Sequence, residues 1–248
     1  MATNVQAKTE VQARYDGFAR RELNAKGTFE EIGPSKAYFR VRKLETALRM
    51  GSYAPGAHLL EIGCSIGQYS FALAQKGFRV TGADLSPESI RLAQERLARS
   101  KTEGLRFVNS DAEDLGQFPD NYFDGVLSFS TLRYVPDLFR ACAEISRVLK
   151  PGGRAVVDFP NRWCPWFYLK PWLGSERHPH DRWFTPAEVA RVLEGAGLRT
   201  IGIRRILFTP TVLPGGLLPV FKVIDAVGER IPLVRNTAGI IIAVAQKS

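Results

Sequence analysis

The chain has 248 residues, of which 45% are hydrophobic and 24% are charged. This composition suits one domain with a substantial core and excludes a globally disordered chain. The three cysteines are widely spaced, so neither a disulfide framework nor a metal-ligand pattern is indicated, and a cytoplasmic location is expected. The polar start of the sequence lacks the apolar core of a signal peptide, and no apolar run in the sequence is long enough to span a bilayer.

The net charge of +9 is unevenly distributed along the chain. Residues 1–58 carry 10 basic and 6 acidic side chains, residues 59–160 carry 12 and 13, and residues 161–248 carry 12 and 6. The positive excess therefore lies outside the central segment. It is either a solvated basic surface or a feature that attracts an anionic substrate, an acidic lipid surface or nucleic acid. Nucleic acid is the least favoured partner, because no RNA-binding motif is present.

Helical and strand patterns alternate along most of the chain. Helices are expected over residues 4–24, 35–50, 67–76, 86–98, 137–149 and 185–197. Strands are expected over residues 57–62, 78–83, 105–110, 123–129, 154–160, 198–208 and 237–246. This alternation predicts a parallel sheet wound in the right-handed sense. We expect a single domain, 1–248, with an N-terminal helical cap at 1–56, a core at 57–160 and elaborations at 161–248.

The most informative stretch is LLEIGCSIGQ, residues 59–68. It predicts a strand that ends near Glu61, a tight turn with Gly63 and Gly67, and then a helix. Such a turn presents backbone N–H groups to a ligand at the carboxyl edge of a parallel sheet, and glycine lets the backbone come close to that ligand. Asp84 ends the second predicted strand and Asp111 the third. Taken singly, each acid is explained as a helix cap or a turn residue, but packing alone does not explain the ordered set.

Two other nucleotide-binding motifs fit this turn poorly. A nicotinamide-binding domain prefers G-x-G-x-x-G after its first strand, whereas Gly63 and Gly67 are four positions apart. A P-loop needs G-K-[ST] after the turn, and this sequence lacks it.

The ordered set E-x-G-x-x-x-G, Asp84, Asp111, FDGVLS and LKPGG resembles the class I S-adenosylmethionine-dependent methyltransferases over about residues 57–200. The resemblance implies an α/β, Rossmann-like, doubly wound and mostly parallel seven-stranded sheet. Helices would cover both faces, with an N-terminal helical cap and an insertion before the last strand. The family turn usually has a further glycine where this chain has Ser65.

The resemblance also implies residues that bind S-adenosyl-L-methionine. Gly63, Cys64, Ser65 and Gly67 would lie beneath its amino acid tail and ribose, and Glu61 would support the tail. Asp84 would accept hydrogen bonds from both ribose hydroxyls, a role that suits a carboxylate with two oxygens.

The remaining cofactor contacts follow from the next two strands. Leu85 would pack on the adenine, and Asp111 would accept from its amino group, with Ala112 and Glu113 beside it. Ser128 and Phe129 end the fourth strand, where the methionine portion should lie.

Four candidate catalytic residues follow from the same comparison. Tyr15 lies in ARYDGFAR, which resembles an element that covers the cofactor, although it could simply anchor a helix. Tyr134 occupies the position of a histidine in many members, which puts a histidine base there in doubt. His178 and His180 precede the helix that follows W-F-T-P, and the alternative for both is a polar loop role. Proximity and exclusion of water should dominate catalysis.

The methyl acceptor is suggested only by composition. Residues 163–184 contain all four tryptophans, and they and residues 207–233 mix bulky apolar side chains with basic ones. This favours methyl transfer to an O, N or C atom of a small amphiphilic or aromatic metabolite, which could be anionic or quinone-like. The alternatives are a lipid-linked or macromolecular acceptor, and a non-catalytic sensor or scaffold. Residues 217–231 predict an amphipathic helix, which would contact a membrane surface, the core or another subunit.

Overall fold

The computed structural model describes residues 2–21, 33–169, 180–211 and 215–248. Its centre is a seven-stranded sheet in the order β3-β2-β1-β4-β5-β7-β6. The strands are β1 (His58–Ile62), β2 (Arg79–Asp84), β3 (Leu105–Asn109), β4 (Phe123–Ser128), β5 (Leu149–Pro160), β6 (Leu198–Ile206) and β7 (Ile240–Lys247). Only β7 runs antiparallel to its neighbours β5 and β6. The predicted α/β class and the mostly parallel sheet are confirmed.

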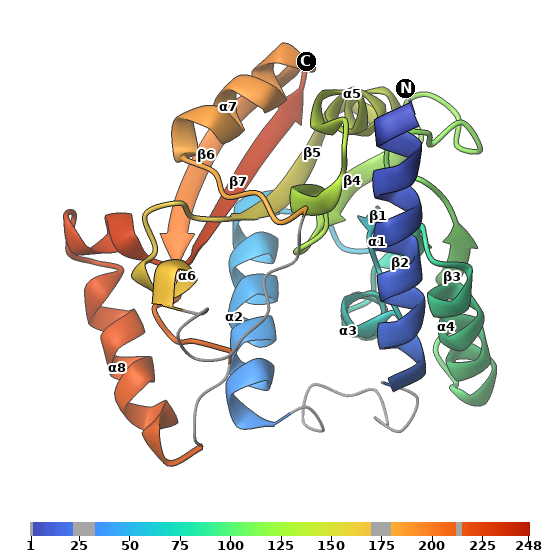
Figure 1. Cartoon of the computed structure of the whole chain (residues 1–248). Helices are drawn as coiled ribbons and strands as arrows, with labels where there is room; N and C mark the ends of the chain where they lie inside the picture. The colour runs from blue at the N-terminus through green and yellow to red at the C-terminus, as the bar shows by residue number, and fades with distance from the viewer. Residues whose placement is uncertain (1, 22–32, 170–179, 212–214) are drawn as a thin grey trace.

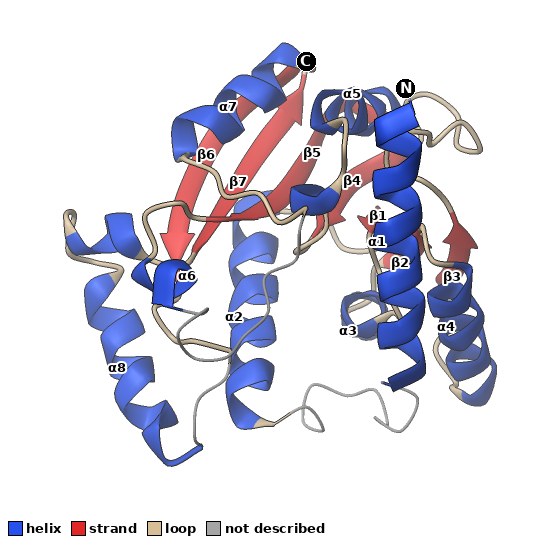
Figure 2. Cartoon of the chain, in the orientation of Figure 1, coloured by secondary structure: helices blue, strands red, loops and turns tan. Residues whose placement is uncertain are grey.

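Helices flank this sheet on both faces (Figures 1 and 2). The described helices are α1 (Ala2–Arg21), α2 (Pro34–Gly51), α3 (Gln68–Gln75), α4 (Pro87–Arg99), α5 (Leu138–Val148), α6 (Pro165–Leu169), α7 (Pro186–Gly195) and α8 (Leu218–Gly228). Helix α4 begins at Ser86, whose hydroxyl accepts from the Ser89 N–H, and α7 begins at the predicted capping box of Thr185 and Glu188. None of the helices in the described part of the chain is long and apolar enough to cross a membrane.

The alternation of side chains along each strand divides the core into two layers. Leu60 and Val126 point to the face covered by α5 and α7, whereas Leu59 and Leu127 point to the face covered by α2, α3 and α4. All four side chains are fully buried. The strand order reverses between β1 and β4, and open α/β sheets bind ligands beside such a reversal, at the carboxyl ends of the strands.

Candidate active site

A cavity of about 550 Å³ lies at the carboxyl ends of β1, β2 and β4. Helices α1 and α2 contribute further lining residues, among them Lys8 and Lys43. The cavity is lined by many of the residues predicted from the sequence: Tyr15, Gly63, Cys64, Ser65, Asp84, Leu85, Asp111, Ala112, Phe129 and Tyr134. The fold thus brings together residues from six separate segments of the chain.

The turn after β1 comes close to its neighbours because two of its residues are glycines. Gly63 has φ of 76° and Gly67 has φ of 81°. A Cβ on Gly63 would lie 1.9 Å from Thr131 Oγ1, so no other residue fits there without movement. Ser65, at the usual family glycine, also has a positive φ, of 49°, which is a strained conformation for serine. The turn therefore has a positive φ at Gly63, Ser65 and Gly67, although only two of these residues are glycines.

Asp84 is held rigidly at the end of β2. Its two carboxylate oxygens accept the backbone N–H groups of Ser65, at 2.8 Å, and Ser86, at 2.9 Å. Burial raises the pKa of this carboxyl, while the two N–H donors favour its charged form. Each oxygen keeps a second lone pair for a ligand, so Asp84 can still accept from a vicinal diol.

Asp111 and Glu113 both bind a lysine from the N-terminal helix. Lys8 Nζ of α1 lies 2.6 Å from a carboxylate oxygen of each. Glu113 is buried and also accepts the backbone N–H of Asp137, at 2.8 Å, so it fixes the loop before α5. Of this acidic pair, only Asp111 lines the cavity.

Four predicted cofactor-binding residues are not among those that line the cavity: Glu61, Gly67, Glu113 and Ser128. Glu61 is buried, its carboxylate accepts the hydroxyl of Ser70, and burial raises its pKa to about 8. Ser128 is buried and its hydroxyl donates to the Ile62 carbonyl at 3.0 Å. Both side chains fasten the strand ends, so any effect on a ligand would pass through the turn that they support.

The three described candidate catalytic residues do not all lie in the cavity. The rings of Tyr15 and Tyr134 meet edge to face with centroids 5.9 Å apart, and both line the cavity. Burial is the main cause of a raised pKa at each of these tyrosines, so neither is anionic near neutral pH. His180 lies outside the cavity wall and contacts Glu10 of α1 through Nε2, at 2.8 Å. His178 is outside the described residues.

A buried lysine in the cavity wall was not among the residues predicted from the sequence. Lys43 of α2 forms an ion pair with Asp158 of β5, and these side chains are 2% and 1% exposed. Lys43 Nζ also donates to the Ser130 hydroxyl at 2.7 Å, and Asp158 accepts the Ser130 N–H at 2.5 Å. Burial lowers the pKa of Lys43, against the attraction of Asp158.

Aromatic rings surround this ammonium group. Its nitrogen is 5.5 Å from the ring centroid of Phe39, 6.0 Å from that of Tyr69 and 5.4 Å from that of Phe129. The cavity is also lined by Phe167 and Trp183, whose rings stack at 5.3 Å. Aromatic side chains therefore line much of the cavity around Lys43.

The described part of the insertion before the last strand contributes little to the lining of this cavity. Within the described part of residues 207–233, Thr211 is the residue that lines this cavity. Helix α8, which forms the centre of the insertion, lies instead beside α2 (Figure 1).

Comparison with known proteins identifies the family. Residues 60–157 match the model of the methyltransferase domain. The chain is 30% identical over 224 residues to the ubiquinone biosynthesis O-methyltransferase of Xanthomonas axonopodis pv. citri, covering 85% of this chain and 91% of the relative. It belongs to the class I S-adenosylmethionine-dependent methyltransferases.

Two further matches agree with this assignment. The demethylmenaquinone methyltransferase of Tropheryma whipplei is 29% identical over 187 residues, which cover 67% of this chain and 77% of that protein. A solved S-adenosylmethionine-dependent methyltransferase of Methanosarcina mazei matches with a TM-score of 0.59 and 27% identity, covering 79% of this chain and 94% of the other. The enzyme is therefore an S-adenosylmethionine-dependent methyltransferase.

The cavity fits the cofactor of this family. Gly63 of the turn lines the cavity with backbone alone, and Asp84 beside it presents a fixed carboxylate to a diol. S-adenosylmethionine supplies a methyl group on a positively charged sulfur, already activated for displacement. The protein has to hold this group and the acceptor in line and keep water away.

Proposed function

We propose that this methyltransferase acts on a phenolic hydroxyl of a small, quinone-type aromatic molecule. The observation that carries the proposal is Lys43, a buried cation beside Ser130 at the end of β4 and among the rings of Phe39, Tyr69 and Phe129. A fixed positive charge lowers the pKa of a nearby hydroxyl and stabilises the ionised oxygen that attacks the methyl carbon. The names of the relatives from Xanthomonas and Tropheryma support the quinone class.

The proposal assigns roles to the other residues of the cavity. The Gly63–Gly67 turn supports the cofactor tail, Asp84 accepts from the ribose, and Asp111 with Ala112 meets the adenine. Tyr15 and Tyr134 close over the cofactor from α1 and the loop after β4, which excludes water. Phe167 and Trp183 pack against the acceptor ring.

The substrate class is tested with a methyl donor that carries a deuterated methyl group. Each acceptor class is offered separately, and the products are detected by mass. The classes are catechols and hydroquinones with and without apolar tails, carboxylated phenols, amines, total lipid, protein and RNA. Transfer to a phenolic oxygen supports the proposal. Transfer only to protein, RNA, nitrogen or carbon contradicts it.

The role of Lys43 is tested by removing the ion pair as a unit. Lys43→Met alone leaves Asp158 buried without its charged partner, which can destabilise the fold. The double variant Lys43→Met, Asp158→Asn removes both charges and keeps their size. We expect it to bind S-adenosylmethionine as wild type does and to lose about 100-fold or more in kcat, the range for removing one charge-stabilising group. Unchanged turnover, or an equal loss of cofactor affinity, would show that Lys43 does not act on the acceptor.

A further inference from the structure

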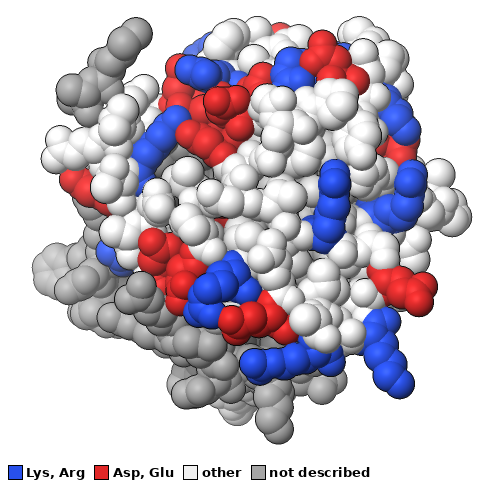
Figure 3. Space-filling view, turned by 90° about the vertical axis from the view of Figure 1, so that its right-hand side faces the viewer, with Lys and Arg blue, Asp and Glu red and all other residues white. Residues whose placement is uncertain are grey.

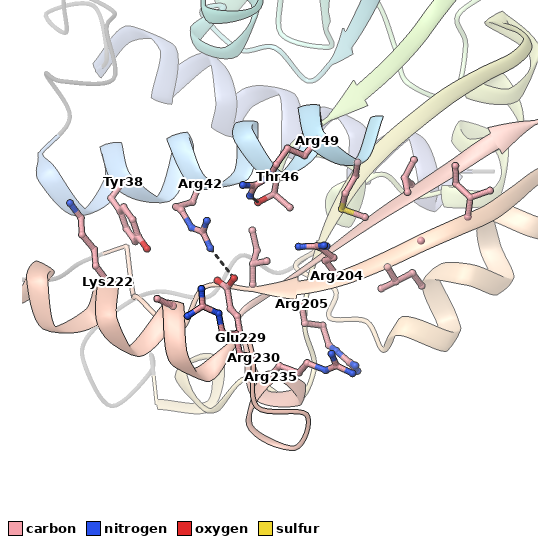
Figure 4. A pocket seen from close by; sticks show the side chains of 17 residues that line it. Tyr38, Arg42, Thr46, Arg49, Arg204, Arg205, Lys222, Glu229, Arg230 and Arg235 are labelled. Carbon is pink, nitrogen blue, oxygen red and sulfur yellow. Dashed lines mark hydrogen bonds and ion pairs between the residues drawn. The ribbon is translucent and has the colours of Figure 1, made fainter. Parts of the chain in front are cut away.

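A second cavity, of about 1070 Å³, lies on the other side of α2 from the active site. It is bounded by α2, the edge strand β6 and α8, and by the segment after α8. Figure 4 shows the side chains that line it. We call it the basic groove, after the side chains of Arg42, Arg204, Arg205, Lys222, Arg230 and Arg235.

The basic groove contains far more positive than negative charge. Arg or Lys account for seven of its seventeen lining residues, and Glu229 is the one acid among these seventeen. Glu229 is already engaged, because it accepts from Arg42 at 2.8 Å (Figure 4). It also accepts from the Leu207 N–H at 3.1 Å. Within the described residues, Arg204, Arg205 and Arg235 have no ion pair with a carboxylate.

The positive charges in the basic groove repel one another. Burial and the nearby charge of Arg235 lower the pKa of Arg205. On the face of the molecule near α1 and α4, by contrast, Lys and Arg are mixed with Asp and Glu (Figure 3). A bound anion would relieve the repulsion in the groove, and clustered arginines match phosphate geometry well.

Helix α8 is fixed on its inner side and bare on its outer side. Asp225 is buried and accepts the backbone N–H groups of Phe208, at 2.5 Å, and Thr209, at 3.1 Å. The outer side carries four apolar residues at i, i+3, i+4 and i+7, which we call the α8 stripe. These residues are Val220, Val223, Ile224 and Val227. Their side chains are 40% to 62% exposed. Because the helix is anchored through Asp225, the exposed stripe is a stable feature of the surface.

We infer that the basic groove and the α8 stripe together form a docking face for an anionic phospholipid surface. An interfacial helix places its apolar side chains among the acyl chains while flanking Lys and Arg side chains bind headgroup phosphates. Lys222 lies on α8 itself, Arg230 and Arg235 lie in the segment after it, and all three are exposed. A second copy of the chain fits the face less well, because residues 161–248 carry 12 basic and 6 acidic side chains in each copy.

Helix α6 connects this docking face to the active site. Trp166 donates from its indole N–H to the Phe208 carbonyl at 2.8 Å, and its ring lies 6.4 Å from that of Phe221 on α8. The next residue, Phe167, lines the active-site cavity. Docking through α8 therefore places the acceptor side of the active site next to the lipid surface, where an amphiphilic molecule concentrates.

The test is cosedimentation of the full chain with vesicles that contain no methyl acceptor. One set is phosphatidylcholine alone, and the other contains phosphatidylglycerol as well. We expect at least about tenfold tighter binding to the anionic vesicles, weakened by salt, since each Lys or Arg near such a surface contributes about 1 kcal/mol. Equal binding to both vesicle types, or no binding to either, would overturn the inference.

Two pairs of substitutions separate the charges from the stripe. One double variant combines Arg204→Gln with Arg235→Gln, and the other combines Val223→Glu with Val227→Glu. Each should weaken vesicle binding about tenfold or more. The matched controls on α4, Arg99→Gln and Ala98→Glu, are exposed and should bind as wild type does. Retained thermal stabilisation by S-adenosylmethionine shows that each variant is folded, and this readout is independent of the acceptor. Variants that bind vesicles like wild type would overturn the inference.

Two further measurements distinguish other occupants. Calorimetry with inorganic phosphate tests for a free anion site, and sedimentation velocity without lipid tests for self-association. Stoichiometric phosphate binding that abolishes vesicle binding would assign the groove to a free anion. A dimer that Val223→Glu, Val227→Glu dissociates would assign the stripe to a second copy. A monomer with weak phosphate binding supports the membrane assignment.

Discussion

Helix α2 separates two cavities whose charged groups are organised in opposite ways. On the active-site side, Asp84 and Lys43 each have short-range partners that fix their positions. In the basic groove, Arg205 and Arg235 lie close together, and within the described residues neither forms an ion pair with a carboxylate. The first cavity is preorganised for a ligand of defined shape, whereas the second attracts negative charge with little geometric constraint. Substitutions should therefore have large effects on the first side and small ones on the second.

The largest effect is expected at the turn after β1. Gly63→Ala should destabilise the protein by about 2–5 kcal/mol, from the left-handed backbone and from the clash with Thr131. Gly56→Ala is the matched control, because Gly56 has a similar φ of 73° but nothing within 4 Å of its Cβ position. Urea denaturation measures both. If the two variants lose equal stability, the close packing of the turn is unimportant.

A smaller effect concerns the pH dependence of stability. Burial raises the pKa of Glu61 to about 8 from 4.5, so the folded state binds an extra proton between these values. Stability from this group is present below pH 4.5 and is lost as the pH rises through 8. Glu61→Gln should remove this loss, on the order of a few kcal/mol by pH 9, relative to the exposed control Glu103→Gln. A stability profile unchanged from wild type would show that folding does not shift the pKa of Glu61.

The contact between α1 and Asp111 should have a modest effect on ligand affinity. Lys8 forms an ion pair with Asp111, the carboxylate that the family resemblance assigns to the adenine. Lys8→Met should therefore tighten S-adenosylmethionine binding by up to about fivefold, because partly exposed ion pairs contribute up to about 1 kcal/mol. Calorimetric titration measures the change. Weaker binding would mean that Lys8 holds the cofactor instead of competing with it.

The smallest effect is expected in the basic groove. Arg205→Gln removes a repelled charge, so stability should stay within about 0.5 kcal/mol of wild type or rise slightly. Arg42→Gln is the contrast, because it breaks the bond to Glu229 and should cost about 1 kcal/mol. Urea denaturation of the two variants measures the difference. A large loss for Arg205→Gln would show that the groove is preorganised like the active site.

The fold was largely predictable because its signals are local. Strand periodicity and the caps at Ser86 and Thr185 fix element boundaries within one or two residues of those observed in most cases. The LKPGG segment is an exception. The sequence predicts a strand only from residue 154, whereas the structure includes LKPGG in β5, where the pairing with β4 has a register shift. Asp84 and Asp111 were found because they follow strands that end at the same edge of the sheet.

The rest depends on contacts between distant segments. A lysine within a helix is usually solvated, so only the packing of α2 on the sheet shows that Lys43 is buried against Asp158. Arg42, Arg205 and Arg235 are far apart in sequence and meet only through the tertiary fold. The amphipathic pattern of α8 was visible, but the side that remains exposed was not.

The central claim is that the cavity at the carboxyl ends of β1 and β2 binds S-adenosylmethionine through Asp84. Calorimetric titration of the cofactor into wild type, Asp84→Ala and the exposed control Asp114→Ala tests it directly. We predict one site per chain, a loss of about 1–3 kcal/mol of binding free energy for Asp84→Ala and no change for Asp114→Ala. Equal affinities in all three proteins, or binding of a nicotinamide dinucleotide in place of S-adenosylmethionine, would contradict the account.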